Sequence, residues 1–297
     1  MIIPAYLQKG DTVAIIATAR KISQEELNEA IAFLESYGLV VLLGKYVFEV
    51  CNQYAGTDEQ RSEDLQWVLD SSSIKAVFFA RGGYGTVRLL DTVSFNGLLK
   101  HPKWLAGYSD ITVLHSAVYN LGIATLHSTM PINFHKHESA TASMMQALFG
   151  ERLAIEAPAD MHNREGKARA KVMGGNLSLI YSLSGTVHDI KTDGSILFIE
   201  DLDEYLYHVD RMMMQLKLSG KLSKLAGLIV GGMTDMKDNL VPFGKTAEAI
   251  ILEAVQEYNY PVCFNFPAGH IDKNMALYFG KEAELTVSKE SVSLAYL

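Results

Sequence analysis

Short apolar runs alternate with amphipathic stretches through the first half of the chain. Residues 13–17, 39–43 and 77–80 have the length and composition of buried β-strands. The stretches between them carry apolar residues at helical spacing, and Ser23 and Thr57 precede them as expected N-cap residues. Strands that alternate with helices predict a parallel sheet with helices packed on its faces.

The second half of the chain has a different pattern, in which the last strand-like runs follow one another closely. Closely spaced short strands are typical of antiparallel hairpins, whereas the earlier ones are separated by helical stretches. The pattern predicts a smaller, mixed α/β domain. Its expected strands lie near residues 170–173, 196–199, 228–230, 262–266, 277–279, 283–287 and 291–296.

The two patterns divide the chain into an N-terminal α/β domain at residues 1–150 and a C-terminal α/β domain at residues 169–297. The stretch from about Pro131 to Lys171 has weak periodicity, and residues 151–168 within it are expected to form the linker. A chain of 297 residues with 48% hydrophobic composition is long enough to give each domain its own core.

Composition and charge narrow the functional classes. The net charge of −8 disfavours binding to nucleic acid, because an acidic surface repels phosphate groups. The N-terminus lacks the pattern of an export signal, and no apolar run reaches the roughly 18 residues of a membrane span. Cys51 and Cys263 lack C-x-x-C spacing and are expected to be ordinary thiols. These features favour a cytoplasmic protein without membrane or nucleic-acid partners.

Three strand-like runs end on side chains that together could carry acyl transfer: Ser109, Glu200 and His270. A serine hydroxyl needs a base, an imidazole can take and return a proton, and a carboxylate can orient the imidazole. Ser109 is expected at a strand-to-helix turn before a helix over residues 111–120, where free N–H groups could hold an oxyanion. The fragments therefore predict a serine hydrolase.

Each of these residues also has a simpler interpretation. Ser109 alone would be a helix cap, and His270 alone a loop histidine bonded to the backbone. Most carboxylates around Glu200 are expected to be solvated, because a run of charge usually marks a wet loop. Asp203 and Glu204 are reserve candidates for the acid, and either would leave the reaction class unchanged.

The three fragments belong to a longer series of ordered motifs. Their order of serine, acid and histidine is that of the α/β-hydrolases, but Ile111 occupies the place of the second glycine in the G-x-S-x-G turn. The series instead resembles the LD-carboxypeptidase family, the muramoyl-tetrapeptide carboxypeptidases that also include the microcin C immunity proteins. The motifs are AGYSD (106–110), ILFIED (196–201), PAGH (267–270), GDTVAIIA (10–17), YAGTDEQR (54–61), RGGYG (81–85), GGNL (174–177) and YHVDR (207–211).

The resemblance implies a serine carboxypeptidase that removes the terminal D-alanine from murein tetrapeptides in cell-wall recycling. In that mechanism Ser109 is the nucleophile, His270 is the base, and Glu200 orients His270. The resemblance further assigns the oxyanion hole to the N–H groups of Gly83 and Asp110. No metal or organic cofactor is required.

The resemblance also has consequences for substrate binding and assembly. The substrate carries several free carboxylates, so a cationic side chain is expected near the site, and Arg81 is the candidate. The serine and the Glu/His pair come from different domains in the family, which places the site at the domain cleft. A homodimer is implied as well.

Two other functions remain as alternatives. A microcin C immunity-type hydrolase of aminoacyl-nucleotide amides would need an aromatic platform for a nucleobase, and Trp67 and Trp104 both fit structural positions instead. A noncatalytic two-lobed ligand-binding protein would not need an intact set of Ser, Glu and His.

Two further motifs are given structural interpretations. His135-Lys136-His137 lacks the acidic partners and spacing of a metal site, so a structural or surface role is expected. Gly174-Gly175-Asn176 lacks the lysine of a phosphate-binding loop and is interpreted as a strand-to-helix turn capped by Asn176.

Overall fold

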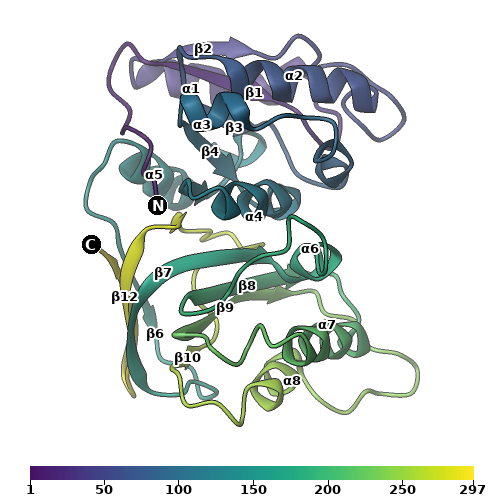
Figure 1. The fold of residues 1–297 in the computed structure, drawn as a ribbon, viewed down its shortest axis with the longest axis vertical. Helices are drawn as coiled ribbons and strands as arrows, with labels where there is room; N and C mark the ends of the chain where they lie inside the picture. The colour runs from purple at the N-terminus through teal and green to yellow at the C-terminus, as the bar shows by residue number, and fades with distance from the viewer.

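The computed structural model describes residues 1–297 and arranges them in two lobes, each built around one β-sheet (Figure 1). The strands of the first sheet are β1 (Thr12–Ile16), β2 (Val40–Leu43), β3 (Ile74–Phe79), β4 (Trp104–Gly107), β5 (Thr125–His127) and β11 (Leu277–Phe279). They lie in the order β11-β5-β4-β3-β1-β2. Neighbouring strands are parallel except for β11, which pairs antiparallel with β5.

Helices cover both faces of the first sheet. They are α1 (Gln24–Ser36), α2 (Asp58–Asp70), α3 (Asn96–Lys100), α4 (Thr112–Asn120) and α5 (Glu138–Leu148). Helices α1 and α5 pack on one face, and α2, α3 and α4 pack on the other. Capping boxes begin α1 and α2, at Ser23 with Glu26 and at Thr57 with Gln60, as the sequence predicted.

The second sheet is mixed. Its strands are β6 (Ala154–Pro158), β7 (Gly166–Asn176), β8 (Ile196–Leu202), β9 (Gly227–Thr234), β10 (Val262–Cys263), β12 (Glu282–Val287) and β13 (Ser291–Tyr296). Strands β7 to β10 are parallel, and β12, β13 and β6 continue the sheet in antiparallel pairs. Its helices are α6 (Leu177–Ser182), α7 (Leu206–Leu218) and α8 (Ala247–Ala254). None of the helices in the structure is both long and apolar enough to span a bilayer.

The expected α/β class is confirmed, with a mostly parallel N-terminal sheet and a mixed C-terminal sheet. The sequence pattern did not show which sheet each late strand would join. Strand β11 returns to the first sheet, although the pattern placed it with the C-terminal hairpins. Strand β6 lies inside residues 151–168, the segment expected as a linker, and pairs with β13. The domain limits stay a prediction.

The two sheets share one apolar core, which fixes the ends of β4 and β8 relative to each other. Phe279 on β11 and Phe198 on β8 are both buried, and their ring centroids are 6.2 Å apart. Burial of one such side chain stabilises the fold by about 1.5–3 kcal/mol, so this contact opposes separation of the lobes. Figure 1 shows α4 at the edge of the upper lobe that faces the lower lobe.

Two buried histidines in the first lobe predict a loss of stability in acid. Burial lowers the pKa of His115 to about 4 and that of His127 to about 3. An unfolded histidine titrates near pH ~6.5, so the unfolded chain takes up these protons first as the pH falls. The free energy of unfolding is therefore highest above that pH. We expect it to fall by roughly 2 kcal/mol per histidine between about pH 7 and about pH 5.

Urea unfolding at both pH values measures this loss. His115→Gln removes one titrating group and should make the loss smaller by roughly 2 kcal/mol. His101 is exposed and unpaired, so His101→Gln is the matched control and should leave the loss unchanged. Equal pH dependence in the wild type and in His115→Gln would contradict the assignment.

Candidate active site

Ser109 lies at a sharp turn between β4 and α4. Strand β4 ends at Gly107, and a 3₁₀ turn at Ser109–Ile111 leads into the helix, so the expected strand-to-helix turn is confirmed. Ser109 has a φ of 61°, a left-handed conformation that is strained for a residue with a side chain. A Cβ atom on Gly82 would lie 3.1 Å from Ser109 Oγ, so glycine lets this loop close on the hydroxyl. The turn presents Ser109 beyond the end of the sheet.

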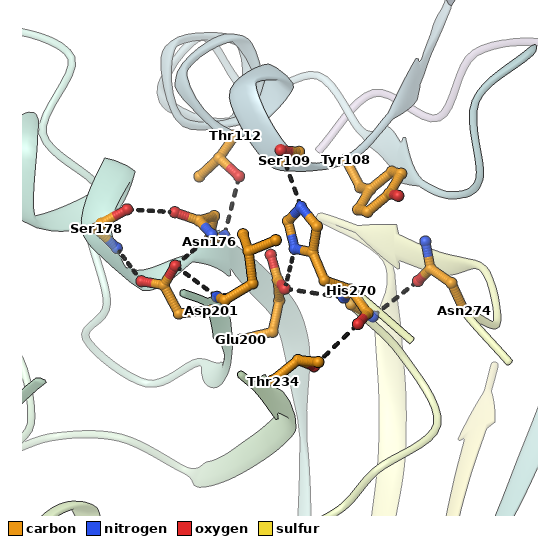
Figure 2. A network of polar contacts seen from close by, with 12 residues as sticks. Tyr108, Ser109, Thr112, Asn176, Ser178, Glu200, Asp201, Thr234, His270 and Asn274 are labelled. Carbon is orange, nitrogen blue, oxygen red and sulfur yellow. Dashed lines mark hydrogen bonds and ion pairs between the residues drawn. The ribbon is translucent and has the colours of Figure 1, made fainter. Parts of the chain in front are cut away.

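Ser109, His270 and Glu200 form one hydrogen-bonded chain, although they lie far apart in the sequence (Figure 2). His270 Nε2 is 3.1 Å from Ser109 Oγ, and His270 Nδ1 is 2.7 Å from Glu200 Oε2. The Glu200 side chain is fully buried, and the His270 side chain is 14% exposed. When Nδ1–H donates to the carboxylate, the lone pair on Nε2 faces the hydroxyl. This is the arrangement that removes a proton from a serine.

Glycine at position 269 lets His270 approach Glu200. Gly269 has a φ of +103°, and a Cβ atom there would lie 2.7 Å from the Glu200 Cβ atom. Its N–H donates to Asn274 Oδ1 at 2.8 Å, and the next N–H, of His270, donates to Glu200 Oε2 at 3.1 Å. The loop therefore fixes both the backbone and the imidazole of His270 against the carboxylate.

The pKa of His270 lies above its ordinary value of 6.5. Burial lowers this pKa, but the charge of Glu200, its hydrogen bond and the charge of Asp201 together raise it by more. The two carboxylates thus stabilise the imidazolium form of His270. A base that must accept a serine proton and then hold it benefits from this direction of shift.

The other carboxylates near Glu200 have different partners. Asp203 forms an ion pair with Lys237 at 2.6 Å, and Glu204 bonds His208 at 2.6 Å. Neither reserve candidate contacts His270, so Glu200 is the acid that the fold brings to the imidazole.

A polar link between the lobes was not predicted from the sequence. The N–H of Asn176, at the end of β7, donates to Thr112 Oγ1 at the start of α4 at 3.0 Å (Figure 2). The Asn176 amide donates to Asp201 Oδ1 at 2.8 Å.

Burial, followed by the charge of Glu200, raises the pKa of Asp201 to about 7. The side chain of Asn176 also caps α6, so the capped turn expected there is confirmed.

Of the two residues expected in the oxyanion hole, Gly83 lines the same cavity as Ser109, and Asp110 is the next residue after Ser109 in the chain. Gly83 has a φ of +121°, and its N–H donates to no other group of the protein. Asp110 follows Ser109 in the 3₁₀ turn, and its buried side chain accepts a bond from the Thr86 N–H at 2.8 Å. That bond ties the turn of the nucleophile to the segment that follows the glycine-rich loop.

A cavity of about 240 Å³ opens beside the Ser109 hydroxyl. Arg81, the candidate substrate contact from the sequence, lines this cavity, and its guanidinium donates to the Lys21 carbonyl at 3.2 Å. The cavity is lined by Arg20, Arg81, Gly82, Gly83, Tyr108, Ser109, Met130, Ile132, Asn133, Lys136 and His270.

Sequence comparisons identify the family. Models of the LD-carboxypeptidase N-terminal and C-terminal domains match residues 13–128 and 169–285. A probable murein peptide carboxypeptidase of Bacillus subtilis is 36% identical over an alignment that covers 97% of this chain and 92% of the relative. The chain belongs to the LD-carboxypeptidase family.

Two further similarities agree with that membership. The murein tetrapeptide carboxypeptidase of Pseudomonas aeruginosa is 31% identical, with 92% of each chain covered. The crystal structure of a muramoyltetrapeptide carboxypeptidase from Oxalobacter formigenes superposes with a TM-score of 0.88 at 27% identity, covering 96% of this chain and 98% of that one. The same two-lobed fold is thus shared over nearly the full length.

Proposed function

We propose that this LD-carboxypeptidase family member is a serine peptidase that releases the terminal D-alanine from murein tetrapeptides. The observation that carries the proposal is the hydrogen-bonded chain from Ser109 through His270 to Glu200. Murein peptides are proposed as substrates because the relatives from Bacillus subtilis and Pseudomonas aeruginosa are described as murein carboxypeptidases.

The first half of the reaction forms an acyl-enzyme. Ser109 Oγ attacks the carbonyl carbon of the L-centre that precedes D-alanine, and His270 Nε2 takes the hydroxyl proton. Glu200 stabilises the imidazolium that results. The carbonyl oxygen becomes an oxyanion, for which the N–H groups of Gly83 and Asp110 are the proposed donors. His270 then gives its proton to the departing nitrogen, the C–N bond breaks, and D-alanine leaves.

The second half of the reaction restores the enzyme. A water molecule attacks the acyl carbon, and His270 Nε2 takes one of its protons. The ester bond to Ser109 Oγ then breaks, and the serine oxygen recovers a proton from the imidazolium. The product is a murein tripeptide with a new carboxylate. The proton transfers in both halves are supported by the contacts of His270 with Ser109 and Glu200.

Incubation with two purified substrates tests the proposal. We expect the protein to release D-alanine from murein tetrapeptide, as detected by chromatography of the free amino acid, and to leave an aminoacyl-sulfamoyl adenosine intact. Release from the second compound alone would contradict the murein assignment and favour the aminoacyl-nucleotide alternative. Binding of tetrapeptide without turnover would favour a noncatalytic role.

A further inference from the structure

The cavity beside Ser109 is strongly basic, although the chain as a whole is acidic. Arg20, Arg81 and Lys136 line it, and no aspartate or glutamate does. The net charge of the chain is −8, so this concentration of cations runs against the overall balance. A concave surface lined by one sign of charge attracts ligands of the opposite sign. The cavity is therefore suited to an anionic group.

The three cationic side chains differ in whether they have hydrogen-bond or ion-pair partners within the protein. The Arg81 guanidinium donates to the Lys21 carbonyl and lies 3.9 Å from Glu26 Oε1. The side chains of Arg20 and Lys136 form no hydrogen bond or ion pair within the protein. Unpaired cations in one small cavity repel each other and do not stabilise the fold. Arg20 and Lys136 are thus available to a ligand.

The stem of Arg20 lies against the glycine-rich loop. A Cβ atom on Gly83 would lie 2.6 Å from both Cγ and Cδ of Arg20, so the glycine provides the space that this stem fills. The neighbouring glycine, Gly82, is the one whose Cβ would come within 3.1 Å of Ser109 Oγ. The glycine that contacts Arg20 is therefore the chain neighbour of the glycine that contacts Ser109.

Peptide geometry limits which substrate carboxylate can reach this place. In a carboxypeptidase, the terminal carboxylate belongs to the residue that leaves. Consecutive residues of a peptide are about 3.8 Å apart, so that carboxylate lies within one residue of the scissile carbonyl. Arg20 and Lys136 line the same cavity of about 240 Å³ as Ser109, so they are candidates to bind that carboxylate. Carboxylates farther along the substrate have to bind farther from the nucleophile.

We propose that Arg20 and Lys136 form the subsite that binds the C-terminal carboxylate of the peptide substrate, and so restrict cleavage to the last residue. The guanidinium offers paired N–H donors that match a carboxylate, and the ammonium adds a point charge. This assignment rests on the proposed function, and it gives the terminal carboxylate to Arg20 and Lys136 rather than to Arg81.

Binding to the Ser109→Ala protein tests the subsite without turnover. The probes are Nα-acetyl-L-lysyl-D-alanine and its C-terminal amide, which differ only in the terminal charge, and calorimetric titration gives both dissociation constants. We expect the acid to bind roughly 10- to 100-fold more tightly than the amide, as charge-assisted hydrogen bonds allow. In the same background, Arg20→Met with Lys136→Met should bring that ratio close to one.

Lys21→Met is the matched control, because Lys21 is an exposed lysine next to Arg20 that does not line the cavity. It should keep the preference for the acid, and thermal unfolding should show that all the variants are folded. A preference that survives in the double variant, or equal binding of acid and amide by the parent, would overturn the subsite.

Release of D-alanine from murein tetrapeptide by the unmodified protein judges the proposed function separately. If the tetrapeptide is cleaved but the acid is not preferred, the subsite is wrong and the function stands. If the tetrapeptide is not cleaved but the acid preference depends on Arg20 and Lys136, the subsite stands and the function is wrong.

Discussion

Ser109→Ala is expected to lower turnover of murein tetrapeptide by roughly 10⁴- to 10⁶-fold, because the groups of a catalytic triad act as a unit. Without the Oγ atom no acyl-enzyme forms. The hydrolysis rate that remains comes from the oxyanion donors and substrate binding, and it exceeds the uncatalysed rate in water only modestly by comparison with the intact enzyme. Circular dichroism and thermal unfolding should match the wild type, since alanine adopts the φ of 61° at about the same cost as serine. Single-turnover release of D-alanine measures the effect.

Ser109→Ala is a cleaner test than removal of His270. Glu200 Oε1 is buried without a hydrogen-bond partner, and Glu200 Oε2 accepts bonds from the backbone and the ring of His270. These bonds from His270 therefore stabilise the buried carboxylate. Loss of the imidazole would leave a buried charge without its partner and would disturb the fold as well as the reaction. Ser182→Ala, at an exposed serine of α6, is the control and should keep full turnover. Near-normal rates in Ser109→Ala would remove Ser109 from the mechanism.

Most strands could be predicted from the sequence, because their apolar runs end at polar residues or glycines. The runs at residues 277–279 and 291–296 coincide with β11 and β13. Their partners could not be predicted, since an apolar run shows that a strand is buried and not which strand lies beside it. Helix α5 fell in a stretch that was assigned weak periodicity, and it has no side-chain N-cap bond at His137 to mark its start.

The candidate site was predictable where a motif combined a strand end with a reactive side chain. Ser109, Glu200 and His270 each had that signal, and the structure brings them into contact. The bond from the Asn176 N–H to Thr112 depends on how the lobes pack, which local pattern does not encode.

The cationic subsite was missed for a similar reason. Arg20 and Lys136 come from loops far apart in the chain, and neither stands in a motif that suggests an anion site. Lys136 even lies within the His135-Lys136-His137 segment that was given a structural or surface role. Only the fold shows that the two side chains line one cavity.

Glu200→Gln is expected to lower turnover by about 10⁴-fold, the effect known when the acid of a triad becomes an amide. The buried volume is nearly unchanged, so the loss should come from the charge. Without that charge the pKa of His270 falls, because Glu200 supplies the two largest effects that raise it. His270 must be neutral to accept the serine proton, so activity is lost as the pH falls through its pKa. The acid limb of the kcat/KM profile should therefore move to lower pH in Glu200→Gln.

Glu204→Gln provides the matched control for that experiment. Glu204 lies four residues from Glu200 on the same segment, but its carboxylate bonds His208 and does not contact His270. The substitution removes one negative charge from the same region, so it should leave both turnover and the acid limb close to those of the wild type. If Glu204→Gln lost activity and Glu200→Gln kept it, the acid of the catalytic chain would be Glu204, reached through a rearrangement of the loop after β8. If both variants shifted the acid limb equally, the shift would reflect the overall charge of the region and would not support a specific pair between Glu200 and His270.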